Sequence, residues 1–67
     1  MKKVLLTVAG FDPSSGAGLT LDLKVFARLG FYGVAIPTTL TIQNSYRFYR
    51  QSPLKPEFIL EAYKKLK

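Results

Sequence analysis

The sequence predicts an α/β fold in which helices flank a mostly parallel sheet, and two observations predict it. Residues 4–9 (VLLTVA) run almost continuously apolar, as in a parallel strand that is covered on both faces and lies inside a sheet. A glycine-rich segment, a helical pattern and a second apolar stretch follow in that order, which is typical of a strand-helix-strand crossover. The 67 residues are about half of an ordinary domain, so we expect the opening part of a longer sheet.

The elements after the first strand follow from local patterns. Residues 10–18 (GFDPSSGAG) contain three glycines and a proline, which predict a loop with demanding backbone angles. Apolar residues then recur at helical spacing, and Gly30 follows as a stop, so the pattern predicts a helix over residues 17–29.

The second half of the chain has a weaker pattern. Residues 31–36 predict a second strand, and Pro37, which has no N–H group for the ladder, marks its end or a bulge. Residues 43–53 lack a clear periodicity, so we expect a polar loop. A second helix begins at Pro56, a position that proline favours, with Glu57 in its first turn.

The composition excludes several kinds of site. The chain has no Cys and no His, which excludes disulfides, thiolate or imidazole metal ligands and Ser-His or Cys-His nucleophile pairs within it. A hydrophobic content of 48% and a charged content of 21% indicate a globular segment. No apolar stretch approaches the roughly 18 residues of a membrane span, so we expect a cytoplasmic protein without a membrane partner.

The net charge of +6 is concentrated in the second half of the chain, which includes Arg47, Arg50 and Lys55. This basic surface either binds an acidic partner such as nucleic acid or is a solvated helix face and loop. The second use is the more common, so we expect no nucleic-acid partner.

The glycine-rich loop lies where α/β proteins bind ligands, beyond the carboxyl end of a strand and before a helix N-terminus. Its backbone N–H groups favour an anion or a polar small molecule. A Walker loop is excluded because no lysine lies between Lys3 and Lys24, and the dinucleotide motif fails because Leu21 stands where its third glycine belongs. The loop is therefore either a ligand contact of another kind or a bare tight turn.

Three polar side chains near this loop are candidates for ligand contacts. Asp22 lies in the second turn of an otherwise apolar helix, where it is either an exposed residue or a hydrogen-bond acceptor at the floor of a pocket. Gln43 and Asn44 close the region of the second strand at the same sheet edge. Their amides either recognise a heterocycle through a donor and an acceptor or form a turn.

Three segments together carry a resemblance to a known family: residues 9–18 (AGFDPSSGAG), 22–26 (DLKVF) and 39–44 (TLTIQN). With them, the chain resembles the N-terminal part of hydroxymethylpyrimidine/phosphomethylpyrimidine kinases over essentially its whole length. The resemblance implies a ribokinase-like three-layer sandwich, a superfamily that also contains pyridoxal kinases. Residues 1–67 then form the N-terminal segment of a single domain and are incomplete on their own.

The resemblance also implies a function in thiamin biosynthesis. These kinases use ATP and Mg to phosphorylate 4-amino-5-hydroxymethyl-2-methylpyrimidine and its phosphate. The resemblance places the catalytic base and most of the ATP site in a C-terminal segment, so we expect the 67 residues alone to be inactive without the remainder of the kinase or a complementary chain. A homodimer is an expectation by analogy. The positions that match the family's substrate-binding residues are Gly10, Asp12, Ala17, Asp22 and Gln43.

Three departures from the family pattern bear on these expectations: Ser15 stands where glycine is common, Pro37 interrupts a usually regular strand, and Arg47-Phe48 replaces a Gly-Val pair in the flap near the substrate. Two alternatives stay open, a pyridoxal-type kinase and a non-catalytic basic module for binding or assembly. The Gly-Ala-Gly sequence at residues 16–18 favours the pyrimidine substrate over pyridoxal.

Overall fold

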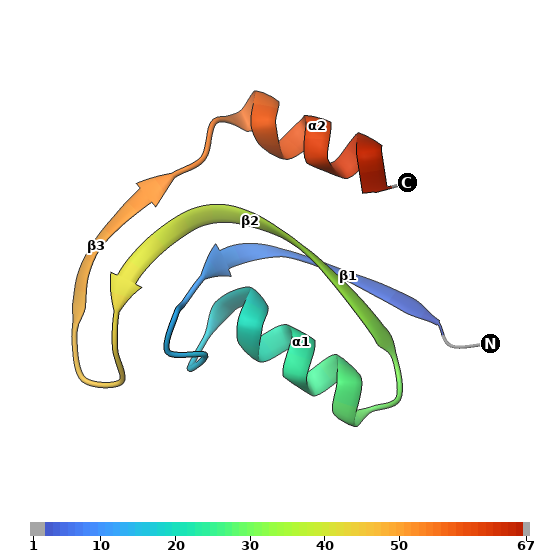
Figure 1. Cartoon of the computed structure of the whole chain (residues 1–67), viewed down its shortest axis with the longest axis horizontal. Helices are drawn as coiled ribbons and strands as arrows, with labels where there is room; N and C mark the ends of the chain where they lie inside the picture. Colours follow the sequence, from blue (N-terminus) through green and yellow to red (C-terminus); the bar gives the residue numbers. More distant parts are fainter. Residues whose placement is uncertain (1–2, 67) are drawn as a thin grey trace.

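The computed structural model describes residues 3–66 and contains a three-stranded sheet with two helices (Figure 1). The strand order is β1-β2-β3, with β1 parallel to β2 and β2 antiparallel to β3. The predicted α/β class is confirmed, and one strand was not predicted. In chain order the elements are β1 (Val4–Phe11), α1 (Gly18–Arg28), β2 (Tyr32–Gln43), β3 (Phe48–Pro53) and α2 (Pro56–Leu66).

The sheet lies between the two helices (Figure 1). On one face, α1 packs so closely that a Cβ atom at Gly33 would lie 2.8 Å from Leu23 Cδ2 and 3.0 Å from Phe26 Cδ2. Any larger residue at this position would force the Leu23 and Phe26 side chains to move. On the other face, α2 lies over the sheet, where Ile59 lines a cavity together with Ile36.

Both helices form where the pattern predicts them, within one residue. Ala17 has extended backbone angles (φ −159°, ψ 179°) and is the N-cap of α1, so the helix begins one residue later than expected. It ends just before Gly30, whose φ of +87° suits glycine. The helix α2 begins at Pro56, with Glu57 in its first turn, as predicted.

The strand β2 is 12 residues long and continues through Pro37, so the expectation that it ends at Ile36 is wrong. Pro37 pairs with Ala9, and the register then shifts, because Phe11 pairs with Leu40. Two steps along β1 therefore match three steps along β2, which is a β-bulge. The bulge was the other expectation for Pro37, and it is confirmed.

The expectation of a polar loop over residues 43–53 is wrong for its second half, which forms β3. The turn before it is held by Asn44, whose Oδ1 accepts hydrogen bonds from the N–H groups of Tyr46 (2.8 Å) and Arg47 (3.0 Å). The strand shows no apolar alternation because all 6 of its residues are exposed. Apolar and polar residues alternate in a strand only where one face is buried, so an exposed strand lacks this signal.

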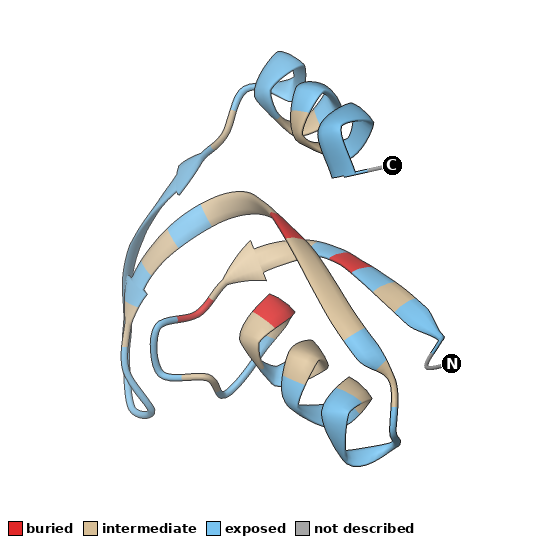
Figure 2. Ribbon diagram, turned by 45° about the vertical axis from the view of Figure 1, so that its right-hand side comes forward, coloured by how far each residue is buried: buried red, intermediate tan, exposed pale blue. Residues whose placement is uncertain are grey.

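The hydrophobic core is small (Figure 2). Among the described residues, the buried hydrophobic side chains are Leu19 and Ile36. The strand β1 lies at an edge of the described three-stranded sheet, and the expectation that it is interior to a longer sheet stays a prediction. Its apolar side chains Val4 and Val8 are 61% and 51% exposed.

Candidate functional site

The candidate site lies at the carboxyl end of β1, where residues 12–17 lead into α1 (Figure 1). Phe11 and Gly18 form a bridge that closes this loop at its base. Gly18 has a φ of +67°, and a Cβ atom on it would lie 2.2 Å from the carbonyl oxygen of Gly10. Both conditions require glycine, so the first residue of α1 is held directly against the end of β1.

Asp12 organises the loop from within. It is 4% exposed, and its Oδ1 accepts hydrogen bonds from the Ser14 N–H (2.8 Å) and the Ser14 hydroxyl (2.6 Å). Its Oδ2 accepts a hydrogen bond from the Gly16 N–H at 3.1 Å. The Ser14 hydroxyl is the largest cause that lowers the pKa of Asp12, and burial acts in the opposite direction. The carboxylate is therefore ionised and engaged by its own loop, and its predicted contact with substrate stays a prediction.

The charge of Asp12 also lies near the positive end of α1. No side chain caps this helix within the described residues, and its first turn holds no acidic residue. The backbone of Ala17, the N-cap, instead contributes to the lowered pKa of Asp12. A negative charge is favourable at a helix N-terminus, and here Asp12 supplies it. The loop therefore suits a neutral polar ligand better than a phosphate group.

Asp22 is attached to the sheet. Its Oδ2 accepts a hydrogen bond of 2.6 Å from the hydroxyl of Thr7, which is 7% exposed. Thr7 precedes Gly10 by three residues on β1, so Asp22 lies beneath the loop and is not bonded to it. No other described residue hydrogen-bonds to its second oxygen, Oδ1. The arrangement leaves one carboxylate oxygen for a ligand.

Gln43 reaches the end of β1 through one other side chain. The Thr41 hydroxyl donates to the carbonyl oxygen of Phe11 at 2.7 Å, and Gln43 Nε2 donates to the same hydroxyl at 2.8 Å. Because the hydroxyl hydrogen is used by Phe11, Thr41 can only accept from Gln43. This fixes the orientation of the amide, with its nitrogen toward Thr41, and leaves Oε1 and the second N–H hydrogen for another partner.

The remaining predicted residues lie around these contacts. A Cβ atom at Gly10 would lie 3.1 Å from Thr39 Cγ2, so Gly10 is packed tightly against β2. The hydroxyl of Thr39 is buried and has no hydrogen-bond partner among the described residues. Asn44 forms the hairpin turn, as one of its two interpretations expected. Gln43 is thus connected through Thr41 to the end of β1, where Gly10 lies. Asp22 is instead bonded to Thr7, nearer the middle of the strand.

Three residues of the site were not predicted: Thr7, Ser14 and Thr41. Two of them left a signal in the sequence. Thr7 is the only polar residue in an apolar strand, and a buried hydroxyl needs a partner. Ser14 follows Asp12 by two residues, which is the spacing of an Asx-turn. Thr41 left none, because its role depends on the register between β1 and β2.

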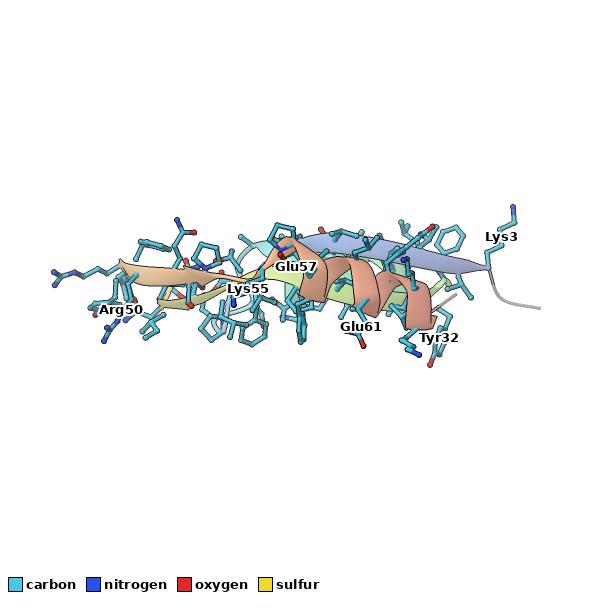
Figure 3. The ribbon with its side chains drawn as sticks, turned by 90° about the horizontal axis from the view of Figure 1, so that it is seen from above. Lys3, Tyr32, Arg50, Lys55, Glu57 and Glu61 are labelled. Atoms are coloured by element: carbon cyan, nitrogen blue, oxygen red, sulfur yellow. The ribbon has the colours of Figure 1, made fainter. Side chains whose placement is uncertain are left out.

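Three of the basic residues, Lys3, Arg50 and Lys55, are labelled in Figure 3. Lys3 and Arg50 lie at opposite ends of the molecule, and the acidic Glu57 and Glu61 lie between them (Figure 3). The guanidinium of Arg47 lies 5.0 Å from the centre of the Tyr49 ring, a cation-π contact. The choice between a solvated surface and a binding patch for the basic second half stays a prediction.

Within residues 3–66, no group of three or more His, Cys, Asp or Glu side chains is placed to hold a metal ion. The glycine-rich loop contains no lysine. None of the described helices is long and apolar enough to span a membrane.

The chain is similar to kinases of vitamin metabolism. A family model described as phosphomethylpyrimidine kinase matches residues 12–66. A hydroxymethylpyrimidine/phosphomethylpyrimidine kinase from Aquifex aeolicus is 41% identical over 61 residues, which are 91% of this chain and 24% of the relative. The crystal structure of a phosphomethylpyrimidine kinase from Clostridium difficile has a TM-score of 0.91 and 36% identity, covering 96% of this chain and 28% of that one. The pyridoxal kinase from Staphylococcus aureus in complex with AMP-PCP and pyridoxal has a TM-score of 0.85 and 30% identity, covering 98% of this chain and 25% of that one.

These similarities confirm the resemblance seen in the sequence and the ribokinase-like fold. The chain spans about a quarter of the length of the curated relatives that it matches. The loop held by Asp12 and the strand end that carries Gln43 both lie within the matched residues. The chain therefore belongs to the phosphomethylpyrimidine kinase family.

Proposed function

We propose that this chain forms the pyrimidine-binding half of a hydroxymethylpyrimidine/phosphomethylpyrimidine kinase of thiamin biosynthesis. The complete enzyme transfers a phosphoryl group from ATP to the hydroxymethyl group of 4-amino-5-hydroxymethyl-2-methylpyrimidine, and then to its monophosphate. The observation that carries this proposal is the fixed amide of Gln43, which Thr41 orients next to the glycine-rich loop.

The free groups of the site match an aminopyrimidine. Such a ring presents an exocyclic amine, which donates, beside a ring nitrogen, which accepts. Gln43 offers the complementary pair, because its Oε1 accepts and its remaining N–H donates. Asp22 Oδ1 accepts a further hydrogen bond from the substrate. Gly10, which packs against β2, and Ala17, the N-cap of α1, border the proposed substrate site, and the charge of Asp12 disfavours a phosphate at the loop itself.

The phosphoryl donor binds elsewhere in the complete enzyme. ATP with Mg supplies the phosphoryl group and the neutralising charge, and the similarity to a kinase solved with AMP-PCP supports this donor. The residues of this chain bind and orient the pyrimidine, and catalysis requires the rest of the fold. The chain alone is inactive, and the complete enzyme acts in the cytoplasm, with a homodimer as its expected assembly.

A second candidate is phosphorylation of pyridoxal, which the similarity to the Staphylococcus aureus enzyme favours. Pyridoxal also carries a hydroxymethyl group, but it has no amine beside its ring nitrogen for the Gln43 amide to pair with. The two candidate substrates therefore differ in whether their ring can pair with the Gln43 amide.

The test is a chimaeric kinase in which residues 1–67 replace the matching part of the Aquifex aeolicus relative. Phosphorylation by ATP is measured with hydroxymethylpyrimidine and with pyridoxal. We expect a higher kcat/KM for the pyrimidine. A preference for pyridoxal would establish the second candidate instead, and phosphorylation of neither compound by the folded chimaera would contradict both.

A further inference from the structure

Phe48 lies directly across the sheet from Gln43. The two residues are register partners of β3 and β2, so their side chains leave the same face of the sheet. The next pair toward the turn is joined by a hydrogen bond of 3.0 Å from the N–H of Asn44 to the carbonyl oxygen of Arg47. Bonded and non-bonded pairs alternate in an antiparallel ladder, so Gln43 and Phe48 form a non-bonded pair, the kind whose side chains lie closest together.

The contact between Arg47 and Tyr49 supports this direction for Phe48. The guanidinium of Arg47 lies 5.0 Å from the centre of the Tyr49 ring, so these two side chains share a face of the hairpin. Phe48 lies between them in the chain and therefore points to the opposite face, the one that carries Gln43. The two neighbouring rings thus have different surroundings: a cation lies over Tyr49, whereas Phe48 lies beside an amide.

The ring of Phe48 has no aromatic or cationic partner within residues 3–66. The residue is 54% exposed, although a phenylalanine gains free energy when its ring is covered. The family pattern has valine at this position, so the ring is particular to this chain. Its place beside the amide of Gln43 makes it available to a ligand that the amide binds.

We propose that Phe48 stacks on the ring of the pyrimidine that Gln43 binds and is thereby a specificity-determining residue of the site. A heterocycle that pairs with the free groups of the amide lies close to the amide plane, because hydrogen bonds to a carbonyl oxygen favour that plane. Its flat faces are then turned to the side chains that flank the amide, and Phe48 is the cross-strand neighbour. Gln43 recognises the edge of the ring, and Phe48 favours a flat aromatic ligand. The inference rests on the proposed function for the identity of that ligand.

The test is calorimetric binding of hydroxymethylpyrimidine to the chimaeric kinase and to variants of the hairpin. Phe48→Val introduces the residue of the family pattern and removes the stacking ring, so the Kd should rise by about 5-fold or more. Tyr49→Val is the matched control, because Tyr49 is 52% exposed and faces away from Gln43. We expect it to leave the Kd within about 2-fold.

A tryptophan at the same position separates stacking from shape. Phe48→Trp keeps a flat ring, so it should bind the pyrimidine within about 2-fold of the parent chimaera. The added fluorescence should be quenched by the bound pyrimidine, whereas that of Tyr49→Trp should not change. A Phe48→Trp variant whose fluorescence does not respond to the bound pyrimidine would contradict stacking.

Two further results would overturn the proposal: an unchanged Kd for Phe48→Val, or equal increases for the two valine variants. Phe48→Leu repeats the test if circular dichroism shows that Phe48→Val is unfolded. A parent chimaera that binds no pyrimidine would contradict the proposed function, and this inference with it. Binding that is insensitive to Phe48 would contradict the inference alone.

Discussion

The side-chain amide of Gln43 donates a hydrogen bond of 2.8 Å to the hydroxyl of Thr41, which itself donates to the end of β1. The two residues lie on one strand, two positions apart, and together they connect β2 to the glycine-rich loop. Thr41 is therefore a positioning residue for the amide that we propose to bind the pyrimidine.

Thr41→Val tests this role. Valine keeps the shape of threonine and removes the hydroxyl, so the amide of Gln43 loses the contact that fixes its orientation. We expect KM for hydroxymethylpyrimidine to rise by about 5-fold in the chimaeric kinase, as the loss of one hydrogen bond implies, with a smaller change in kcat. Thr38→Val, the same substitution earlier in β2, is the control. Equal effects of the two variants on KM would show that Thr41 has only a structural role.

Asp12 makes stability depend on pH. Its pKa is lower in the folded chain than in the unfolded chain, first because of the Ser14 hydroxyl. The stabilisation is therefore fully present above the unfolded pKa of about 3.9 and is lost as the pH falls through the folded pKa. We expect Asp12→Asn to lower the urea midpoint at pH 7 more than at pH 3.

The Ser14→Ala variant separates the hydrogen bond from the charge. It removes the hydroxyl that lowers the pKa of Asp12 most, so the pKa should move upward, as measured by NMR titration of the carboxylate. An unchanged pKa would mean that the backbone N–H groups alone account for the shift.

Gly18→Ala should strongly destabilise the chain. The new Cβ atom would overlap the carbonyl oxygen of Gly10, and the φ of +67° is unfavourable for alanine. Gly30→Ala is the control, because Gly30 has a φ of +87° but no atom within 4 Å of the added carbon. We expect a loss of about 1–2 kcal/mol for Gly30→Ala from the backbone alone and a clearly larger loss for Gly18→Ala, both measured by urea unfolding. Equal losses would mean that the loop base relaxes without cost.

Among the described residues other than glycine, Ser15 alone has a positive φ, at 63°. The family resemblance already marked this position as one where glycine is common. Ser15→Gly should raise the free energy of unfolding by up to about 1 kcal/mol, because relief of the backbone strain exceeds the added freedom of the unfolded chain. A lower urea midpoint for the variant would show that the serine side chain compensates for the strain.

The sequence predicted the parts of the fold that are governed by local rules. The strand β1, the loop, both helices and the bulge at Pro37 follow from apolar spacing, glycine and proline. The strand β3 could not be predicted, because its fully exposed residues carry no pattern. The interior position that the sequence predicts for β1 stays a prediction, because the chain spans about a quarter of the length of its relatives.

The candidate site divides in the same way. The loop and Gln43 were recognisable from the motif, whereas the contacts that hold them depend on pairing between distant residues. Thr7 meets Asp22, and Thr41 meets Phe11, only after α1 has crossed back and β2 has aligned with β1. Such contacts arise from the register of the sheet and not from spacing along the chain.

The pyrimidine half-site is tested most directly by calorimetric binding of hydroxymethylpyrimidine to the chimaeric kinase and to its Gln43→Ala variant. Alanine removes the donor and the acceptor that face the ring, so we expect the Kd to rise by about 10-fold or more. An unchanged Kd would contradict the assignment of Gln43, and with it the proposal that this strand end binds the pyrimidine.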